Sequence, residues 1–211
     1  MADLTALRKA IINGDLKGAV AATKEALAER VDPLSLVTDH MVPAMDEVGR
    51  RFECEDYFVP ELLLSARAMK GALELLRPLL AASGAEPAGR VAIGTVKGDL
   101  HDIGKNLVAS MLEGGGFEVI DLGADVAPEK FVQAVKERGA NIVCLSALLT
   151  VTMPSMKTTI EALKQAGLRD RAKVLIGGAP VTQQYADEIG ADGYGQSATA
   201  AVQLARGLAG R

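Results

Sequence analysis

The sequence predicts a helical part followed by an α/β part: a bundle of four helices over residues 1–84, then a Rossmann-like, doubly wound parallel sheet of five strands over residues 90–211. Three observations predict this. Apolar residues repeat at helical spacing in the first part, and short apolar strands alternate with amphipathic helices in the second. Between them, residues 85–89 read Ala-Glu-Pro-Ala-Gly, which is typical of a linker. We therefore expect two domains.

In the first part, apolar residues recur every three or four positions in four stripes, over residues 4–11, 16–27, 37–52 and 62–80. Asp32-Pro33 has the form of an N-cap followed by a first-turn proline, and Pro60-Glu61 gives a similar start signal. Pro43 lies inside the third stripe, where it predicts a kink or a break because proline cannot donate the helical hydrogen bond.

In the second part, each strand is expected to be short, apolar and followed by a helix. Continuous apolar strands indicate a parallel sheet covered on both faces, and right-handed crossovers make it doubly wound. The predicted strands cover residues 91–96, 117–122, 142–145, 174–176 and 191–194, and the predicted helices 103–113, 128–138, 154–166, 182–189 and 198–208.

Composition argues against several classes of partner and location. The net charge of −4 is not that of a nucleic-acid-binding or anionic-membrane-binding surface. The sequence has no run of 18 apolar residues and no signal-peptide profile at its N-terminus, so we expect a cytoplasmic protein with no membrane span. We expect both cysteines to be reduced, with Cys144 in the core and Cys54 in a charged turn without zinc-ligand neighbours.

Small, hydroxyl-bearing and ionisable residues follow four of the predicted strands. Since ligands of open α/β sheets bind outside the carboxyl ends of the strands, these loops are expected to share one site. No glycine-rich dinucleotide or P-loop pattern is present, which argues against a nucleotide site. The loops cover residues 98–104, 146–152, 177–180 and 193–198.

The first of these loops carries His101, one of only two histidines in the chain. Asp99 lies two residues earlier, so its carboxylate can hydrogen-bond one ring nitrogen while the other faces outward, as around metal-binding histidines. A single imidazole does not make a zinc site, whereas a metal held in a macrocycle needs only one axial residue. The other histidine, His40, has no partner motif and is expected to be structural or exposed.

Each of these residues also has a simpler interpretation. His101 and Asp102 could cap the helix that follows. Ser146 and Thr150 could be ordinary turn residues, and Gly177-Gly178 occurs at many strand-to-helix turns.

The whole pattern resembles a known family. Asp99-x-His101-x-x-Gly104, then 41 residues, Ser146-x-Leu148, then 28 residues and Gly177-Gly178 resembles the cobalamin-binding signature of corrinoid proteins. These proteins serve methanol, methylamine and aryl-ether O-demethylase methyltransferase systems, and they are similar to the cobalamin-binding module of methionine synthase. Residues 1–84 resemble the helical cap domain that precedes this fold.

The resemblance implies a cobalamin (methylcobalamin, cob(I)alamin or a related corrinoid) bound with its nucleotide base detached from cobalt. His101 would be the lower axial ligand, Asp99 would hold its ring, and Thr152 would extend this relay where relatives often have serine. Phe52 and Val59 would shield the upper face, although relatives often have leucine at the latter. The implied cofactor contacts are Gly98, Asp99, Leu100, His101, Asp102, Ile103, Gly104, Ser146, Leu148, Thr150, Gly177, Gly178, Ala198, Phe52 and Val59.

The function implied is that of a methyl carrier between a substrate-specific methyltransferase and an acceptor methyltransferase, with a reductive activase as a further partner. Methyl transfer then requires partner enzymes, so whether the chain alone is an enzyme stays open. One alternative is a cobalamin sensor or regulator, although no DNA-binding segment is visible. Another is the small subunit of a cobalamin-dependent mutase, which generally lacks the cap. The sequence indicates neither the methyl donor and acceptor, nor the oligomeric state, nor the corrinoid species.

Overall fold

The computed structural model describes residues 3–210, which form two compact units. Of these residues, the first unit comprises 3–87 and Glu113–Gly116, and the second comprises Ala88–Leu112 and 117–210. Each unit is considered by itself.

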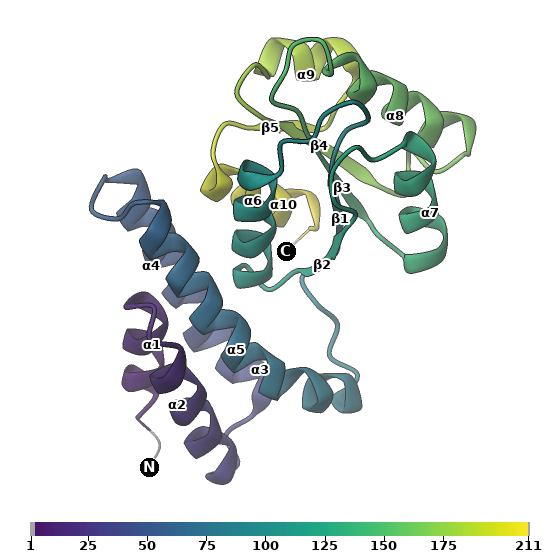
Figure 1. Cartoon of the computed structure of the whole chain (residues 1–211). Helices are drawn as coiled ribbons and strands as arrows, with labels where there is room; N and C mark the ends of the chain where they lie inside the picture. The colour runs from purple at the N-terminus through teal and green to yellow at the C-terminus, as the bar shows by residue number, and fades with distance from the viewer. Residues whose placement is uncertain (1–2, 211) are drawn as a thin grey trace. The chain divides into compact units, whose positions relative to one another are not determined.

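The first unit is entirely helical (Figure 1). The side chains of Asp3, Asp15 and Asp32 cap three of the helices by accepting a hydrogen bond from a backbone N–H of the first turn. The apolar faces of the long helices are buried against one another. The stripes predicted over residues 4–11, 37–52 and 62–80 lie mostly on these buried faces. The second stripe is only half-buried, because the fully buried residues of its helix are Ala19, Thr23 and Ala26. The helices are α1 (Leu4–Ile12), α2 (Leu16–Ala28), α3 (Pro33–Ser35), the π-helix η1 (Leu36–Met41), α4 (Val42–Glu53) and α5 (Val59–Ser83).

The interruption predicted at Pro43 takes the form of a π-helical turn. The N–H of Val42 donates to the carbonyl of Val37, five residues back, instead of four. A proline ring collides with the carbonyl four residues earlier and has no N–H to donate, so a wider turn before Pro43 accommodates it. The chain therefore continues from η1 into α4 instead of breaking.

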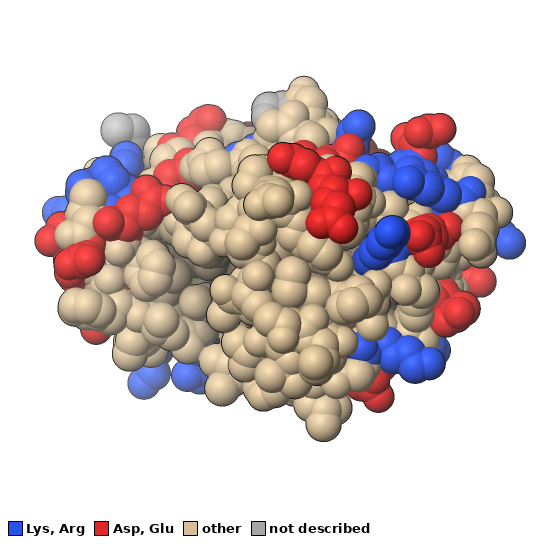
Figure 2. All heavy atoms as spheres, turned by 90° about the horizontal axis from the view of Figure 1, so that it is seen from above, with Lys and Arg blue, Asp and Glu red and all other residues tan. Residues whose placement is uncertain are grey.

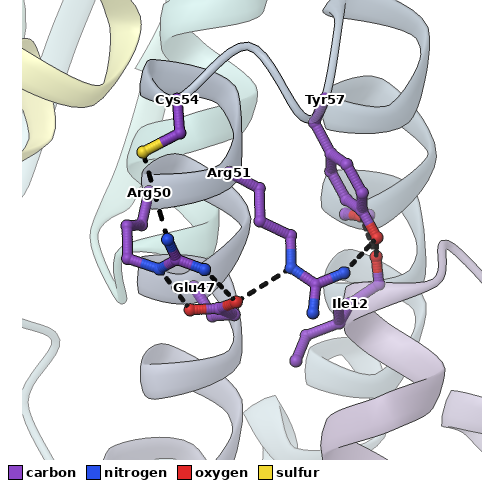
Figure 3. A network of polar contacts seen from close by, with 7 residues as sticks. Ile12, Glu47, Arg50, Arg51, Cys54 and Tyr57 are labelled. Carbon is purple, nitrogen blue, oxygen red and sulfur yellow. Dashed lines mark hydrogen bonds and ion pairs between the residues drawn. The ribbon is translucent and has the colours of Figure 1, made fainter.

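A polar network fixes the turn between α4 and α5 (Figure 3). Glu47 accepts hydrogen bonds from Arg50 and from Arg51, each at 2.8 Å. Arg51 donates onward to the hydroxyl of Tyr57 at 3.1 Å, and that hydroxyl donates to the carbonyl of Ile12 at the end of α1, also at 3.1 Å. The turn is thereby tied to two helices of the unit.

The second unit contains a parallel sheet in the order β2-β1-β3-β4-β5, which confirms the predicted fold class. This order is that of the flavodoxin-like branch of doubly wound folds. The strands are β1 (Arg90–Thr95), β2 (Glu118–Asp121), β3 (Ile142–Ser146), β4 (Lys173–Gly177) and β5 (Gly193–Gly195). The helices are α6 (Ile103–Gly114), α7 (Pro128–Arg138), α8 (Pro154–Gln165), α9 (Gln183–Ile189) and α10 (Ala198–Leu208).

The two faces of this sheet are covered by different helices. Because successive side chains of a strand alternate between faces, Ala92, Val143 and Val174 share one face, which packs into a buried cluster with α7, α8 and α9. Ile93 and Cys144, which pair in register, lie on the other face with α6 and α10. Among residues 3–210, no helix has both the length and the apolar character needed to cross a membrane.

Candidate cofactor site

The strand order creates a crevice at the carboxyl ends of β1 and β3. Helix α6 follows β1 on one face of the sheet and α8 follows β3 on the other, so the two loops diverge at this point. Such a divergence is where doubly wound folds bind ligands. Asp99 and His101 lie in the loop after β1, and Leu148, Leu149 and Thr152 follow β3.

Asp99 joins these two loops. Its Oδ2 accepts hydrogen bonds from the Leu148 N–H at 2.8 Å, the Leu149 N–H at 3.2 Å and the Thr152 hydroxyl at 2.7 Å. Its Oδ1 accepts from the backbone N–H of His101 at 3.0 Å and faces the ring Nδ1 of His101 at 2.8 Å. The side chain is fully buried, so every partner is supplied by the protein.

These contacts decide the protonation state of Asp99. Burial raises the pKa of its carboxyl group, but the hydrogen bonds from Thr152, from the backbone of His101 and Leu148 and from the His101 ring outweigh burial. Together they hold the pKa well below its usual range. Asp99 is therefore an anion that only accepts hydrogen bonds.

The Asp99 anion in turn fixes the tautomer of His101. An ionised carboxylate has no proton to donate, so the ring Nδ1 carries the hydrogen and Nε2 keeps its lone pair. The His101 side chain is 51% exposed. A neutral imidazole oriented in this way can bind a metal through Nε2.

The surroundings of His101 are apolar and open. Leu100, Ile103 and Val151 are 75%, 84% and 81% exposed, which is unusual for such side chains in the absence of a ligand or partner. Figure 2, which looks from above onto the view of Figure 1, shows a broad area without Lys, Arg, Asp or Glu. The exposed side chains of Leu100, Ile103 and Val151 suit an apolar ligand surface.

A cavity of about 330 Å³ extends between the sheet and helices α6 and α10. Its walls are mostly apolar. Burial raises the pKa of the Cys144 thiol to about 12, and Lys105 Nζ lies 2.6 Å from the Asp121 carboxylate, so neither presents a free charge to the cavity. The lining residues are Ile93, Gly104, Lys105, Leu107, Val108, Cys144, Leu145, Ser146, Leu175, Ile176, Gly177, Gly178, Ala179, Tyr194, Gly195, Gln196, Ser197, Ala198 and Ala201.

Two glycines of the cavity wall have different reasons to be glycine. Gly178 has φ +129°, and a Cβ there would lie 1.9 Å from the carbonyl oxygen of Ala147, so the fold itself requires it. Gly104 has no positive φ, and a Cβ there would meet nothing within 4 Å. The open space beside Gly104 is what a group filling the cavity would occupy.

The structure divides the predicted site residues into three groups. Gly104, Ser146, Gly177, Gly178 and Ala198 line the cavity. The second group, at the mouth of the crevice, holds the residues of the loop after β1 together with Leu148, Thr150 and Thr152. Leu148 and Thr150 are exposed and lie outside the cavity lining.

Phe52 and Val59 form the third group and belong to the first unit. Phe52 is half-buried near the end of α4, and Val59 is the exposed first residue of α5. Asp102 precedes α6, and its carbonyl accepts from the Asn106 N–H at 2.7 Å. Its carboxylate accepts from the side-chain amide of Asn106 at 3.1 Å, which is not a capping contact to the backbone.

The sequence-based list omits part of the cavity wall. Leu107 and Val108 lie three and four residues after Gly104, so helical spacing places them on the same face of α6. Tyr194 of β5 and Gln196, which directly follows β5, fall within the predicted site segment 193–198, but the sequence pattern did not select their side chains. Lys105 was missed because lysine is seldom buried, and only its pairing with Asp121 explains its position.

Comparisons with known proteins identify the family. Models of the B12 binding domain match residues 89–203 and residues 4–77. The chain belongs to the B12-binding corrinoid proteins. A corrinoid protein of Desulfitobacterium hafniense strain Y51 is 42% identical over 214 residues, covering 100% of this chain and 99% of the relative. Trimethylamine corrinoid protein 2 of Methanosarcina mazei is 46% identical over 197 residues, or 92% of this chain and 90% of the relative.

Solved structures agree with this placement. A cobalamin-binding protein from Desulfitobacterium hafniense DCB-2 matches with a TM-score of 0.81 and 34% identity, covering 99% of both chains. A chain of the methanol:cobalamin methyltransferase complex from Methanosarcina barkeri matches with a TM-score of 0.86 and 30% identity, covering 98% of this chain and 79% of that one. The predicted family of this corrinoid protein and its cobalamin cofactor are confirmed.

The residues described above fit this cofactor. The His101 ring, oriented by Asp99, lies in the loop that leads to Gly104, and Gly104 lines a mostly apolar cavity and has open space at the position of a Cβ. Because the macrocycle of a corrinoid supplies the equatorial ligands, a single donor from the protein would suffice to bind the metal.

Proposed function

We propose that this corrinoid protein carries a methyl group on cobalamin bound through His101, with the nucleotide base detached from cobalt. The observation that carries the proposal is the His101 ring, half-exposed, with its Nδ1–H donated to the buried Asp99 carboxylate at 2.8 Å. When bound, the cofactor supplies a cobalt centre that accepts and donates a methyl group.

The residues of the crevice would control this ligand. His101 would present Nε2 to the metal, and Asp99 would hold the orientation of the ring through its hydrogen bond with Nδ1–H. Thr152 would hold Asp99 in place through its 2.7 Å hydrogen bond. Removing outer partners of this kind typically reduces metal affinity or activity by about 10–100-fold.

The cavity between the sheet, α6 and α10 would accept the detached nucleotide tail. Its apolar lining suits the faces of a heteroaromatic base, and Ser146 together with backbone groups near Gly177 and Gly178 would orient it. Leu148 and Thr150 would then contact the cofactor outside this cavity.

Within the proposal, residues 1–84 are a cap domain, 85–89 a linker and 90–211 the cobalamin domain. Phe52 and Val59 of the cap would shield the reactive face of the cofactor from water.

The partners would be a substrate-specific methyltransferase and an acceptor methyltransferase, as the complex from Methanosarcina barkeri suggests for methanol, with a reductive activase in addition. The two free cysteines support a cytoplasmic location.

Nitrogen labelling tests the axial ligand directly. The protein is produced with ¹⁵N-histidine, loaded with unlabelled hydroxocobalamin and reduced to the Co(II) state, and its EPR spectrum is recorded. A ¹⁵N ligand splits each cobalt line into two, whereas the ¹⁴N of the cofactor's own base splits it into three. We expect doublets for the wild type.

The two histidines provide matched variants. His101→Ala should abolish the doublets. His40 lies in the π-helix η1 of the first unit, so His40→Ala should preserve them. Triplets in the wild type, or doublets in His101→Ala, would contradict the proposal.

A further inference from the structure

Asp125 has a backbone conformation that needs an explanation. Among the described residues, three that are not glycine have a positive φ: Arg30, Glu55 and Asp125. Arg30 and Glu55 each follow the C-cap of a helix, α2 and α4, where left-handed residues are common. Asp125, with φ 53°, lies instead in the loop between β2 and α7. No helix end accounts for it.

The left-handed conformation lets Asp125 contact the His101 loop at two points. Its Oδ1 accepts a hydrogen bond from the Gly98 N–H at 2.7 Å, and its own N–H donates to the Asp99 carbonyl at 2.9 Å. A strained residue persists where its contacts hold it, and such residues cluster at functional sites.

The rest of this loop is held from other directions. The Thr95 hydroxyl donates to the His101 carbonyl at 3.0 Å, and the Ser155 hydroxyl donates to the Lys97 carbonyl at 3.0 Å. Between these two ends, Gly98 turns with φ +87°, and its N–H has the Asp125 carboxylate as its partner. Asp125 is thus the contact that fixes the middle of the turn leading into Asp99.

We propose that Asp125 is a positioning residue for the axial histidine. It holds the backbone on both sides of the Gly98–Asp99 bond, and the Asp99 carboxylate in turn holds the His101 ring. The inference rests on the proposed role of His101 and adds to it a residue that neither lines the cavity nor touches the ring. A displaced Asp99 would tilt Nε2 away from the cobalt axis.

Two variants separate the carboxylate from the backbone conformation. Asp125→Gly adopts a positive φ without strain but has no acceptor for the Gly98 N–H. Asp125→Asn tolerates the same φ and keeps an acceptor oxygen. Arg30→Gly, at the end of α2 in the first unit, is the control for placing glycine at a left-handed position.

Each variant is loaded with hydroxocobalamin, and its Kd and the ¹⁵N-histidine EPR splitting are measured. Loss of one net hydrogen bond corresponds to about a 2- to 10-fold change in an equilibrium. For Asp125→Gly we expect Kd to rise by about that factor. We also expect a smaller fraction of the Co(II) EPR signal to show the ¹⁵N doublets. Asp125→Asn and Arg30→Gly should match the wild type within about 2-fold.

Amide hydrogen exchange of the cofactor-free protein gives a readout that does not depend on cobalt. The Gly98 N–H should exchange about 2- to 10-fold faster in Asp125→Gly than in Asp125→Asn. Asp125→Gly with wild-type Kd and splitting, or Asp125→Asn as impaired as Asp125→Gly, would overturn the inference. The absence of ¹⁵N doublets in the wild type would contradict the proposed axial role of His101. Equal Gly98 exchange rates in Asp125→Gly and Asp125→Asn would contradict the positioning role of Asp125, whatever the EPR result.

Discussion

At the residue scale, the site depends on one carboxylate that cannot be replaced by its amide without loss. All five contacts of Asp99 are made by donors, three to Oδ2 and two to Oδ1. An asparagine has one acceptor oxygen, and its NH₂ group would face donors whichever way it turned. The buried anion is the arrangement that satisfies every partner.

We therefore expect Asp99→Asn to lower the free energy of unfolding by about 2–3 kcal/mol, because buried donors lose a charged acceptor. Thr152→Val removes one donor and leaves a methyl group of similar size, so its cost should be about 1 kcal/mol. Denaturant unfolding of the cofactor-free protein measures both. Equal stability of Asp99→Asn and the wild type would show that the hydrogen bonds around Asp99 contribute no net stability.

A second carboxylate, Glu47, gives a prediction about pH. Hydrogen bonds from Arg50 and Arg51 lower its pKa from 4.5 to about 2. Because the folded pKa lies below the ordinary value, Glu47 adds stability above about pH 4.5, and this contribution is lost as the pH falls through 2. Glu47→Gln should thus be less stable than the wild type at pH 7, with the difference vanishing near pH 2.

Unfolding curves of the two proteins between pH 7 and 2 provide the measurement. Glu25→Gln is the control, since Glu25 lies on the exposed side of α2. If the stability difference between Glu47→Gln and the wild type stayed constant over this pH range, the lowered pKa of Glu47 would be refuted.

At the element scale, the ends of the parallel strands determine what the site can hold. In the aligned register of β1, β3 and β4, Thr95, Ser146 and Gly177 lie side by side, and the loops leave the sheet from there. The turn after β4 approaches the turn after β3 so closely that a side chain at Gly178 would collide with backbone.

Alanine substitutions at two glycines test this close approach. Gly178→Ala combines a positive φ with a Cβ placed 1.9 Å from the Ala147 oxygen, so we expect a loss of about 3 kcal/mol or more in unfolding free energy. Gly84→Ala also has a positive φ, +72°, but no atom within 4 Å of its Cβ. Its cost should be about 1 kcal/mol. If urea unfolding gave similar losses of unfolding free energy for Gly178→Ala and Gly84→Ala, the close approach of Gly178 to the Ala147 carbonyl would not determine the cost.

At the scale of the whole molecule, binding and stability are linked, and one glycine should affect them in opposite directions. Gly104 begins a helix with ordinary backbone angles and open space beside it. Gly104→Ala should raise the unfolding free energy of the cofactor-free protein by about 0.5–1 kcal/mol, since alanine favours helix. The added methyl group should weaken cobalamin binding, because it enters the space left for the cofactor.

Thermal or urea unfolding with and without cobalamin separates the two effects. Cobalamin at 100 times its Kd should stabilise the wild type by about 2.7 kcal/mol, and at the same concentration a tenfold loss of affinity should reduce that gain to about 1.4 kcal/mol. Gly207→Ala is the control, since Gly207 lies in α10 outside the cavity and also has open space at its Cβ. If cobalamin stabilised Gly104→Ala as much as the wild type, the cofactor would not occupy the open space beside Gly104.

Much of the fold could be predicted from the sequence. The strands and helices of the second unit follow the predicted segments to within a few residues, because their apolar periodicity is local. The pairing of Asp99 with His101 could also be anticipated, since the two residues are neighbours in the chain. Helical spacing alone could not specify the π-helical turn before Pro43.

What only the tertiary structure decided is the set of contacts between distant segments. The resemblance implied the Thr152–Asp99 contact, but not those of Leu148 and Leu149, which meet Asp99 from about 50 residues away. Nor did it imply the ion pair of Lys105 with Asp121 or the contact of Asp125 with the histidine loop. Periodicity shows that strands exist but not their order, and the order β2-β1-β3-β4-β5 brings these loops together. The sequence thus determined the elements and the chemistry of the histidine loop, whereas strand order and register determined which side chains surround it.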